Sequence, residues 1–273
     1  MFSIFTKRRK ASGLKEFGAE IREFQLPHYG TIQYAQWLNP AESPKILTED
    51  KIKFFQKFVK SGDFAIDIGA HTGDTTLPLA LAVGKEGTVL ALEPNPIIFK
   101  ILEKNAQLNP GKVNIMPLCA AAAKYDGEFF YNSSENSFNN GGISEASKSP
   151  HGKFALPNKI KGINLGKYLT GELSRLINKL SFIKIDTEGY DYEIILSLLE
   201  IIEKYKPVVV AECFKKLSKS NRYRLYDILA EKGYSIYYMS NFNASEKFIH
   251  IEKKDMTAWR SFDFCGLPKE KKI

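Results

Sequence analysis

The chain has 273 residues, of which 26% are charged, and its formal net charge is +8. This length suits one α/β domain with a decoration and disfavours two full domains. Most of the excess charge lies in the runs "KRRK" at 7–10 and "KEKK" at 269–272, which leaves the body nearly balanced. No nucleic-acid partner is therefore expected, and the basic tails predict at most a weak contact with an anionic membrane or glycan.

Membrane, export and disulfide signals are weak in this sequence. No apolar run approaches the roughly 20 residues that span a bilayer, so no transmembrane segment is expected. The opening "MFSIF" is too short for a signal-peptide core. The three cysteines Cys119, Cys213 and Cys265 are widely spaced, which indicates neither a disulfide framework nor a zinc site. These features predict a cytoplasmic enzyme without a metal site.

The predicted elements begin with a region of uncertain structure, residues 1–47, in which "HYGTIQYAQW" has strand-like content. "LTEDKIKFFQKFVKSG" predicts a helix that Thr48 caps and Gly62 closes. Strands and helices then alternate, at 64–68, 75–83, 87–92 and 95–107, followed by a third strand in "KVNIMPLCAA". This alternation predicts an α/β fold, a parallel sheet with helices on both faces.

The alternation of strands and helices is interrupted after "GEFFYNSS", which indicates an edge hairpin. Residues 133–163 are rich in Ser, Asn, Gly, Pro and Lys and have little periodicity. A loop of that length inside a compact domain is usually disordered or functional. We favour a lid or an acceptor-binding loop over a passive insert.

The second half of the chain predicts a fourth strand in "SFIKIDTEG", a helix in "YDYEIILSLLEIIEKY" and a fifth strand in "KPVVVAECF". The segments "NRYRLYDILAEKG", "YSIYYMS" and "KFIHIEK" complete a seven-stranded, mostly parallel sheet whose last two strands are antiparallel. These elements predict a main domain that spans 48–255. Residues 256–273, including "FDFCGLPKEKKI", are expected to form a mobile basic tail.

The turn between the strand at 64–68 and the next helix has the spacing Asp67-x-Gly69-x-x-x-Gly73. A P-loop needs Lys and then Ser or Thr after its last glycine, whereas Asp74 and Thr75 follow Gly73 here, and an acid would repel a triphosphate. The G-x-G-x-x-G spacing of dinucleotide sites is also missing. The turn suits a ligand with an amino group and hydroxyls.

Glu93 ends the next strand, roughly 20 residues beyond the glycine turn, where an acid can accept hydrogen bonds from both hydroxyls of a ribose. A nucleoside with a cationic amino-acid tail fits both features, and this describes S-adenosyl-L-methionine. The alternative is that Asp67 and Glu93 merely cap loops.

Three strings, "DIGAHTGDTTLPLA", "ALEPNPIIFKILEKNAQLN" and "FIKIDTEGYDYEIILSL", resemble the FkbM-type family of class I S-adenosylmethionine-dependent methyltransferases. The resemblance covers roughly residues 50–240 and implies a Rossmann-like class I methyltransferase fold. It also implies O-methylation of hydroxyls on sugars, glycans or related natural products. The chain departs from the family in carrying His71 where relatives more often have asparagine, and in its insert at 133–163, so the acceptor cannot be inherited.

Asp186, at the tip of the fourth strand, and Glu188, in the following turn, are candidates to accept a proton from an acceptor hydroxyl. The alternatives are that Asp186 holds the amino group of the cofactor and that Glu188 caps the next helix. His71 is a competing base because imidazole titrates near neutral pH. Glu212 ends the fifth strand and either lines the pocket or pairs with a lysine. A magnesium site built from Asp186, Glu188 and Glu212 is an alternative that their spacing does not demand.

The predicted site residues fall into three groups. The cofactor-binding group comprises Asp67, Gly69, Ala70, His71, Thr72, Gly73, Asp74, Thr75, Glu93, Pro94, Asn95 and Asp186. The acceptor-binding group comprises Asn140, Ser144, Glu188 and Glu212. The catalytic group comprises Asp186, Glu188 and His71.

Two other classes of function compete with this interpretation. Enzymes that methylate nucleic-acid bases usually show N/D-P-P-Y/F after the fourth strand, where this chain has "DTEGYD". An NAD-binding Rossmann enzyme, or a binding module without catalysis, is the second alternative. The sequence leaves the acceptor, the oligomeric state and metal dependence open.

Overall fold

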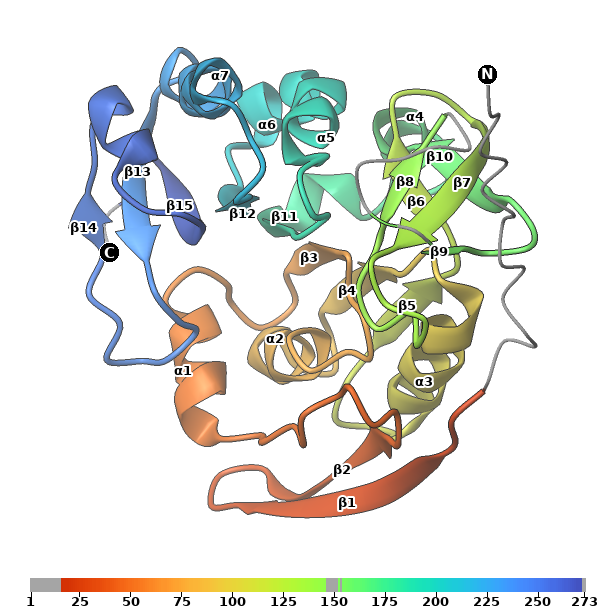
Figure 1. The fold of residues 1–273 in the computed structure, drawn as a ribbon. Helices are drawn as coiled ribbons and strands as arrows, with labels where there is room; N and C mark the ends of the chain where they lie inside the picture. Colours follow the sequence, from red (N-terminus) through yellow and green to blue (C-terminus); the bar gives the residue numbers. More distant parts are fainter. Residues whose placement is uncertain (1–15, 146–151, 153, 272–273) are drawn as a thin grey trace, which may run out of the picture.

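The computed structural model describes residues 16–145, 152 and 154–271. Its central sheet contains β3 (Phe64–Ile68), β4 (Thr88–Leu92), β5 (Ile115–Leu118), β11 (Leu180–Ile185), β12 (Val208–Cys213), β13 (Tyr234–Met239), β14 (Ile249–His250) and β15 (Phe262–Pro268). The strand order is β14-β13-β15-β12-β11-β3-β4-β5 (Figure 1). Neighbours from β5 to β12 are parallel, and the three remaining strands pair antiparallel. The predicted Rossmann-like, mostly parallel α/β fold is confirmed, but the sheet has eight strands and not the predicted seven, because β15 joins it.

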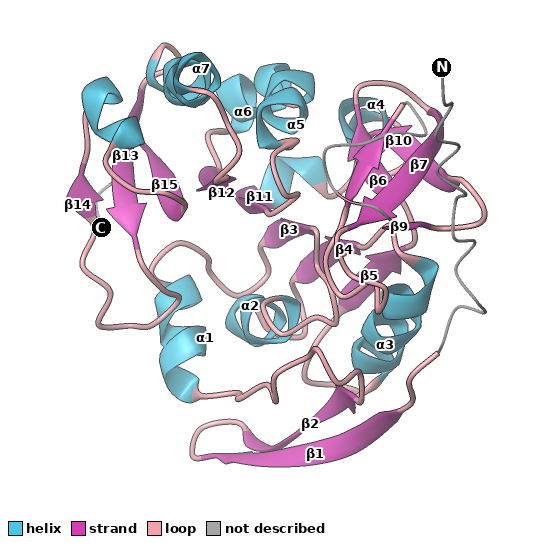
Figure 2. Cartoon of the chain, viewed as in Figure 1, coloured by secondary structure: helices cyan, strands magenta, loops and turns pink. Residues whose placement is uncertain are grey.

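Helices cover both faces of this sheet. They are α1 (Glu49–Gln56), α2 (Thr76–Val83), α3 (Pro96–Gln107), α4 (Leu165–Thr170), α5 (Asp191–Ser197), α6 (Leu199–Tyr205) and α7 (Lys219–Ala230), with short 3-10 helices at Ile177–Lys179 and Lys253–Thr257. Figure 2 shows α1, α2 and α3 on one side of the sheet and α5, α6 and α7 on the other. None of the helices in the described ranges is long and apolar enough to cross a membrane.

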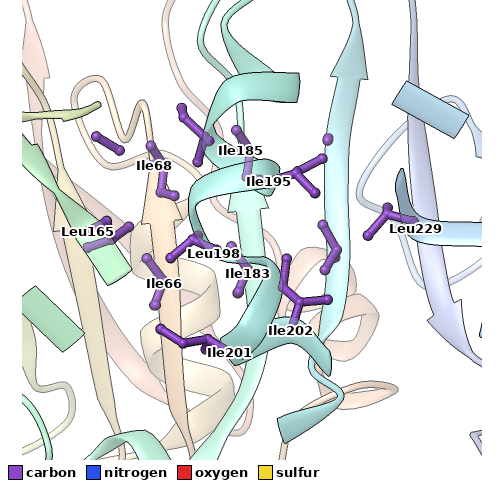
Figure 3. Close-up of a cluster of buried hydrophobic side chains, with 14 of the residues drawn as sticks. Ile66, Ile68, Leu165, Ile183, Ile185, Ile195, Leu198, Ile201, Ile202 and Leu229 are labelled. Carbon is purple, nitrogen blue, oxygen red and sulfur yellow. The ribbon is translucent and has the colours of Figure 1, made fainter. Parts of the chain in front are cut away.

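Burial explains why the predicted central elements form. Every residue of β3, of β4 and of α2 is buried, as expected for parallel strands covered on both faces. Figure 3 shows isoleucines of β3 and β11 packed against Ile195, Leu198 and Ile202 of the helices that follow β11. The predicted single helix over "YDYEIILSLLEIIEKY" is divided into α5 and α6 at Leu198, whose ψ is 5°.

The N-terminal region forms an antiparallel hairpin of β1 (Ala19–Leu26) and β2 (Gly30–Trp37), which Figure 1 shows beyond α2 and α3, away from the sheet. The side-chain amide of Asn105 on α3 fixes this hairpin in place. It accepts from the Ala35 N–H at 2.6 Å and donates to the Ala35 carbonyl at 3.1 Å and the Thr72 carbonyl at 2.7 Å. One buried side chain thus joins the hairpin to the turn between β3 and α2.

A second, smaller sheet lies beside the first. It contains β6 (Ala121–Ala123), β7 (Gly127–Ser133), β8 (Gly142–Ser144), β9 (Phe154–Ala155) and β10 (Ile160–Asn164). The expectation that "GEFFYNSS" is an edge hairpin is wrong, because β7 pairs with β8, β9 and β10. The insert at 133–163 likewise supplies strands to this sheet, while its residues 146–151 and 153 lie outside the described ranges.

The expectation of a mobile C-terminal tail is also wrong. "FDFCGLP" forms β15, which lies between β12 and β13 and pairs antiparallel with both. Phe264 and Cys265 within it have no exposed surface. Conversely, "KFIHIEK" contributes only the two-residue edge strand β14. The basic run at 7–10 lies outside the described residues.

Candidate active site

A cavity of about 380 Å³ opens at the carboxyl ends of β3, β4 and β11, where open α/β sheets bind ligands. The predicted residues that line it are Gly69, Ala70, His71, Asp74, Thr75, Glu93, Pro94, Asn140, Asp186 and Glu188. Its size suits a small ligand. The other predicted residues, Asp67, Thr72, Gly73, Asn95, Ser144 and Glu212, do not line it.

The turn after β3 is packed tightly against the loop after β11. Gly69 has φ +78°, and a Cβ at this position would lie 1.9 Å from the carbonyl oxygen of Asp186. The Asp186 N–H donates to the Ile68 carbonyl at 2.9 Å, and the Gly69 N–H donates to the Leu92 carbonyl at 3.0 Å. Only glycine fits there without displacement of the backbone. Gly69 therefore allows the turn after β3 and the loop after β11 to lie in direct contact.

Glu93 is only 4% exposed and holds this turn from the β4 side. Its Oε2 accepts from the His71 N–H at 3.0 Å, and its Oε1 accepts from the Asn95 N–H at 2.8 Å. Burial raises the pKa of Glu93 against the effect of these bonds. Because each carboxylate oxygen has a second lone pair, the side chain is oriented and still able to accept from a ligand in the cavity.

A buried lysine, Lys184, lies between two of the predicted acidic site residues, Asp67 and Asp186. Lys184 Nζ lies 3.4 Å from Asp67 Oδ1 and 3.2 Å from Asp186 Oδ2, and its side chain is 7% exposed. Burial lowers the pKa of Lys184, but the carboxylates of Asp67 and Asp186 outweigh burial and raise it. Asp67 also accepts from the Thr76 hydroxyl at 2.7 Å. Asp67 therefore positions Lys184 without lining the cavity, whereas Asp186 is part of the cavity lining.

Glu188 differs electrostatically from Asp186. Its backbone has φ +56°, a left-handed conformation that is uncommon for glutamate. Burial and the nearby Asp186 carboxylate raise the pKa of Glu188 and outweigh Lys215 and Lys216, which lower it. The alternative role of Glu188, a cap on the next helix, is absent from the described contacts, where Asp191 accepts from the Gly189 N–H. A carboxylate with a raised pKa is the better proton acceptor near neutral pH.

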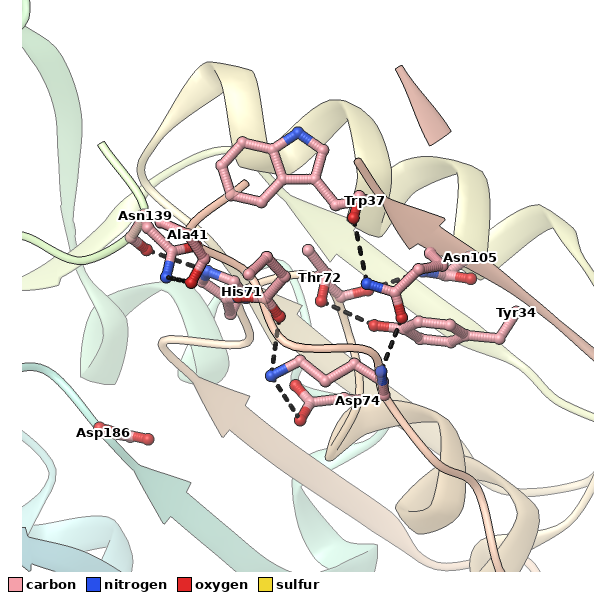
Figure 4. Close-up of polar contacts among 12 residues, drawn as sticks. Tyr34, Trp37, Ala41, His71, Thr72, Asp74, Asn105, Asn139 and Asp186 are labelled. Atoms are coloured by element: carbon pink, nitrogen blue, oxygen red, sulfur yellow. Dashed lines mark hydrogen bonds and ion pairs between the residues drawn. The ribbon is translucent and has the colours of Figure 1, made fainter. Parts of the chain in front are cut away.

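The ring of His71 lies at the cavity wall and is held from two sides. Nε2 is 3.0 Å from the carbonyl oxygen of Asn139, and because a carbonyl can only accept, Nε2 carries the proton. The indole of Trp37 packs against the ring at 5.9 Å between centroids. Figure 4 shows Asn139 and Ala41 beside His71, with Asp186 apart from them. Nδ1 is therefore the nitrogen of His71 that could accept a proton.

Three of the predicted residues outside the lining support the turn and its neighbours. Thr72 bonds the hydroxyl of Tyr34 at 2.7 Å, and Asn95 caps α3 by accepting from the Ile97 N–H at 3.0 Å. Gly73 has φ +91°, and a Cβ there would approach Leu102. These residues shape the turn, and their assignment to the cofactor stays a prediction.

Glu212 does not line the cavity, and it accepts from the Ser261 hydroxyl at 2.7 Å. Burial and the charges of Asp186 and Glu188 raise its pKa to about 7, although the Ser261 bond lowers it. Within the described ranges, no group of three or more His, Cys, Asp or Glu side chains is arranged to hold a metal ion. The assignment of Ser144 and Glu212 to the acceptor stays a prediction.

Sequence reasoning missed the loop after the N-terminal hairpin. Ala41, Glu42, Ser43 and Lys45 line the same cavity, and Lys45 Nζ lies 3.3 Å from Asp74 Oδ2. Burial raises the pKa of Asp74, but the charges of Lys45 and His71 lower it by more than burial raises it. The pKa of Asp74 is therefore below its usual value. Pro40 and Pro44 mark this segment as a loop, yet no sequence signal places it over the turn.

A family model described as "Methyltransferase FkbM domain" matches residues 67–236. The chain belongs to the FkbM methyltransferase family. The match spans β3 to β13 and therefore both the glycine turn and the loop with Asp186 and Glu188. S-adenosyl-L-methionine is the cofactor, and the NAD-binding alternative is left without support.

Other known proteins are similar over part of the chain or in fold. A demethylmenaquinone methyltransferase of Lactobacillus johnsonii is 39% identical over 75 residues, which cover 24% of this chain and 31% of that protein. The chain thus aligns with about a third of the length of this curated relative. A methyltransferase FkbM from Methylobacillus flagellatus has TM-score 0.46 and 14% identity, covering 79% of this chain and 50% of that one. An S-adenosylmethionine-dependent O-methyltransferase from Thermotoga maritima has TM-score 0.44 and 14% identity, with coverages of 94% and 80%.

The donors and acceptors of the cavity fit this cofactor. Glu93 offers an oriented carboxylate for two ribose hydroxyls, and Asp186 offers an anion for a cationic amino group or sulfonium. The lining is acidic at both places, which matches a ligand with hydroxyls and positive charge. The fit supports the sequence interpretation of the turn.

Proposed function

We propose that this methyltransferase transfers the methyl group to a hydroxyl of a sugar, a glycan or a related natural product. The observation that carries the proposal is Glu188, a carboxylate with a raised pKa that lines the cofactor cavity beside Asp186. An alcohol is a poor nucleophile until a base accepts its proton. A base of this kind beside the cofactor is what a hydroxyl acceptor requires.

In this proposal Glu188 accepts the proton of the acceptor hydroxyl. When bound, the cofactor would supply an electrophilic methyl group, whose bond to sulfur would break as its bond to the acceptor oxygen forms, so that the products are a methyl ether and S-adenosylhomocysteine. Glu188 must be ionised to act, so the rate should rise as pH increases through its raised pKa. The left-handed backbone at Glu188 directs a charged side chain from a tight loop, which is where strained conformations often serve function.

Asp186 takes a different part, because its carboxylate is already paired with Lys184 at 3.2 Å. The ammonium group of Lys184 thus already donates to Oδ2 of Asp186. We assign Asp186 to orienting the acceptor hydroxyl or holding the amino group of the cofactor. His71 Nδ1 is the remaining candidate base.

The acceptor side of the cavity supports a polyhydroxylated ligand. Asn140 and Glu188 offer hydrogen-bonding groups, Tyr190 offers an aromatic surface and Ile143 an aliphatic one. A few polar groups among apolar ones are typical of small-molecule sites. Part of this lining, residues 139–143, belongs to the predicted lid or acceptor loop at 133–163, whose closure stays a proposal.

We also propose a cytoplasmic location. All three cysteines are free thiols, which suits a reducing compartment. A weak contact of the basic tails with an anionic surface stays a prediction, and so does the absence of a nucleic-acid partner.

The direct test is product analysis. The protein is incubated with S-adenosylmethionine carrying a deuterated methyl group and a panel of monosaccharides, oligosaccharides and hydroxylated polyketides. Mass spectrometry and NMR then locate the label, and a methyl ether is expected. Labelling exclusively on nitrogen, carbon or a carboxylate would refute the hydroxyl acceptor.

A further inference from the structure

The loop that follows the N-terminal hairpin brings a cation into the cofactor cavity. Lys45 Nζ lies 2.8 Å from Glu42 Oε1 and 3.3 Å from Asp74 Oδ2, and its side chain is 26% exposed. Lys45 and Lys184 are the lysines that line the cavity. Because Lys184 is almost fully buried between two carboxylates, Lys45 is the lysine with access to a ligand anion.

The main chain around Lys45 is held in position. Its N–H donates to Gln36 Oε1 at 2.7 Å, and the Gln36 amide donates to the Trp37 carbonyl at 3.1 Å. Asn39 accepts from the Ala41 N–H at 3.0 Å at the start of the loop. The lysine is therefore presented by a loop fixed to β2, outside the region 67–236 that defines the family domain.

The start of α2 lies next to Lys45 in the lining. Thr75, its N-cap residue, makes no side-chain capping bond, and the first turn of the helix contains no acidic residue. The Leu77 N–H of this first turn already donates to the Gly73 carbonyl at 2.9 Å, so the hydroxyl of Thr75 is the group at this helix start that we assign to a ligand. Lys45 and Thr75 both line the cavity and together offer a charge and hydrogen-bond donors.

We propose that Lys45 and Thr75 bind the α-carboxylate of the amino-acid portion of S-adenosylmethionine. Glu42 and Asp74 hold the ammonium group of Lys45 in place. Burial lowers the pKa of Lys45, but these two carboxylates outweigh burial and raise it, which keeps the ammonium group charged. The inference rests on the cofactor and not on the proposed hydroxyl acceptor.

The test compares ligands that share the nucleoside and differ in the amino-acid end. Calorimetry measures binding of S-adenosylhomocysteine and of 5′-methylthioadenosine, which lacks the amino acid, to the parent and to Lys45→Met. Loss of one charge-assisted contact should weaken S-adenosylhomocysteine roughly 10- to 100-fold. Binding of 5′-methylthioadenosine should change less than about twofold. Lys53→Met, an exposed lysine of α1, should leave both affinities unchanged.

A decarboxylated analogue of S-adenosylhomocysteine completes a double-mutant cycle. It should bind the parent weakly, and Lys45→Met should cause little further loss. Equal losses for all three ligands would overturn the proposal, because they would indicate damage to the nucleoside site. Unchanged S-adenosylhomocysteine affinity would overturn it as well. Lys45→Arg, which keeps the charge, should restore most of the affinity.

Discussion

Replacing Glu93 tests the ribose assignment most sharply. Its carboxylate is 4% exposed and is oriented by the N–H groups of His71 and Asn95 at 3.0 and 2.8 Å. Glu93→Ala should remove two charge-assisted bonds to the ribose and cost about 2–4 kcal/mol of cofactor binding. This corresponds to a dissociation constant weakened roughly 30- to 900-fold. The substitution also leaves two backbone N–H groups without their acceptor, so the melting temperature should fall.

Calorimetric titration with S-adenosylhomocysteine separates binding from stability in this prediction. The 2′-deoxy analogue should bind the parent more weakly and lose less on substitution, because one of the two bonds is already missing. Glu93→Gln keeps one acceptor oxygen and should fall between the parent and Glu93→Ala. Affinity for S-adenosylhomocysteine within twofold of the parent in Glu93→Ala would refute the ribose assignment.

Three further predictions follow from the same geometry. If Asp186 orients the acceptor hydroxyl, Asp186→Asn should lower turnover, but less than Glu188→Gln does. If Asp186 holds the amino group of the cofactor, the same substitution should weaken S-adenosylhomocysteine binding, and steady-state kinetics at saturating cofactor distinguishes the two roles. A larger loss of turnover in Asp186→Asn than in Glu188→Gln would make Asp186 the base. Gly69→Ala should destabilise the fold by about 3 kcal/mol or more, and parental stability in urea unfolding would contradict the close loop contact. Burial and the Asp186 charge raise the pKa of Asp263 to about 6, although Lys184 opposes them. The folded protein therefore binds this proton more tightly than the unfolded chain does, so protonated Asp263 stabilises the fold fully below about pH 4, and this stabilisation is lost as the pH rises through about 6. The free energy of unfolding should therefore fall by on the order of 1–3 kcal/mol more in the parent than in Asp263→Asn between pH 4 and pH 7, and identical pH dependence would count against this burial.

The sequence predicted the centre of the fold because the interactions there are local and repetitive. Fully apolar runs such as β3 and β4, alternating with helices, can form little other than a parallel sheet. β15 was missed because its pairing with β12 and β13 is long-range, and because Gly266, Pro268 and a basic run beside it are typical of a tail. Burial between two strands, and not local propensity, decides its structure.

Some residues of the candidate site could be predicted from the sequence and others could not, for the same reason. Glu93 and Asp186 could be predicted because each follows the end of a parallel strand, and parallel strands end at one edge of the sheet. Lys184 was missed although a lone lysine within a buried strand is itself a sign of a partner carboxylate. Lys45 could not be predicted, because only the tertiary fold brings residues 41–45 over the turn after β3.

The most direct test of the central claim is the pH dependence of methyl-ether formation in the parent and in Glu188→Gln. With labelled S-adenosylmethionine and a hydroxyl acceptor identified by product analysis, the parental rate should rise with pH through the raised pKa of Glu188. Glu188→Gln should lower the rate roughly 10²- to 10⁴-fold and abolish this rise, while S-adenosylhomocysteine still binds. A parental rate and an unchanged pH profile in Glu188→Gln would contradict the account.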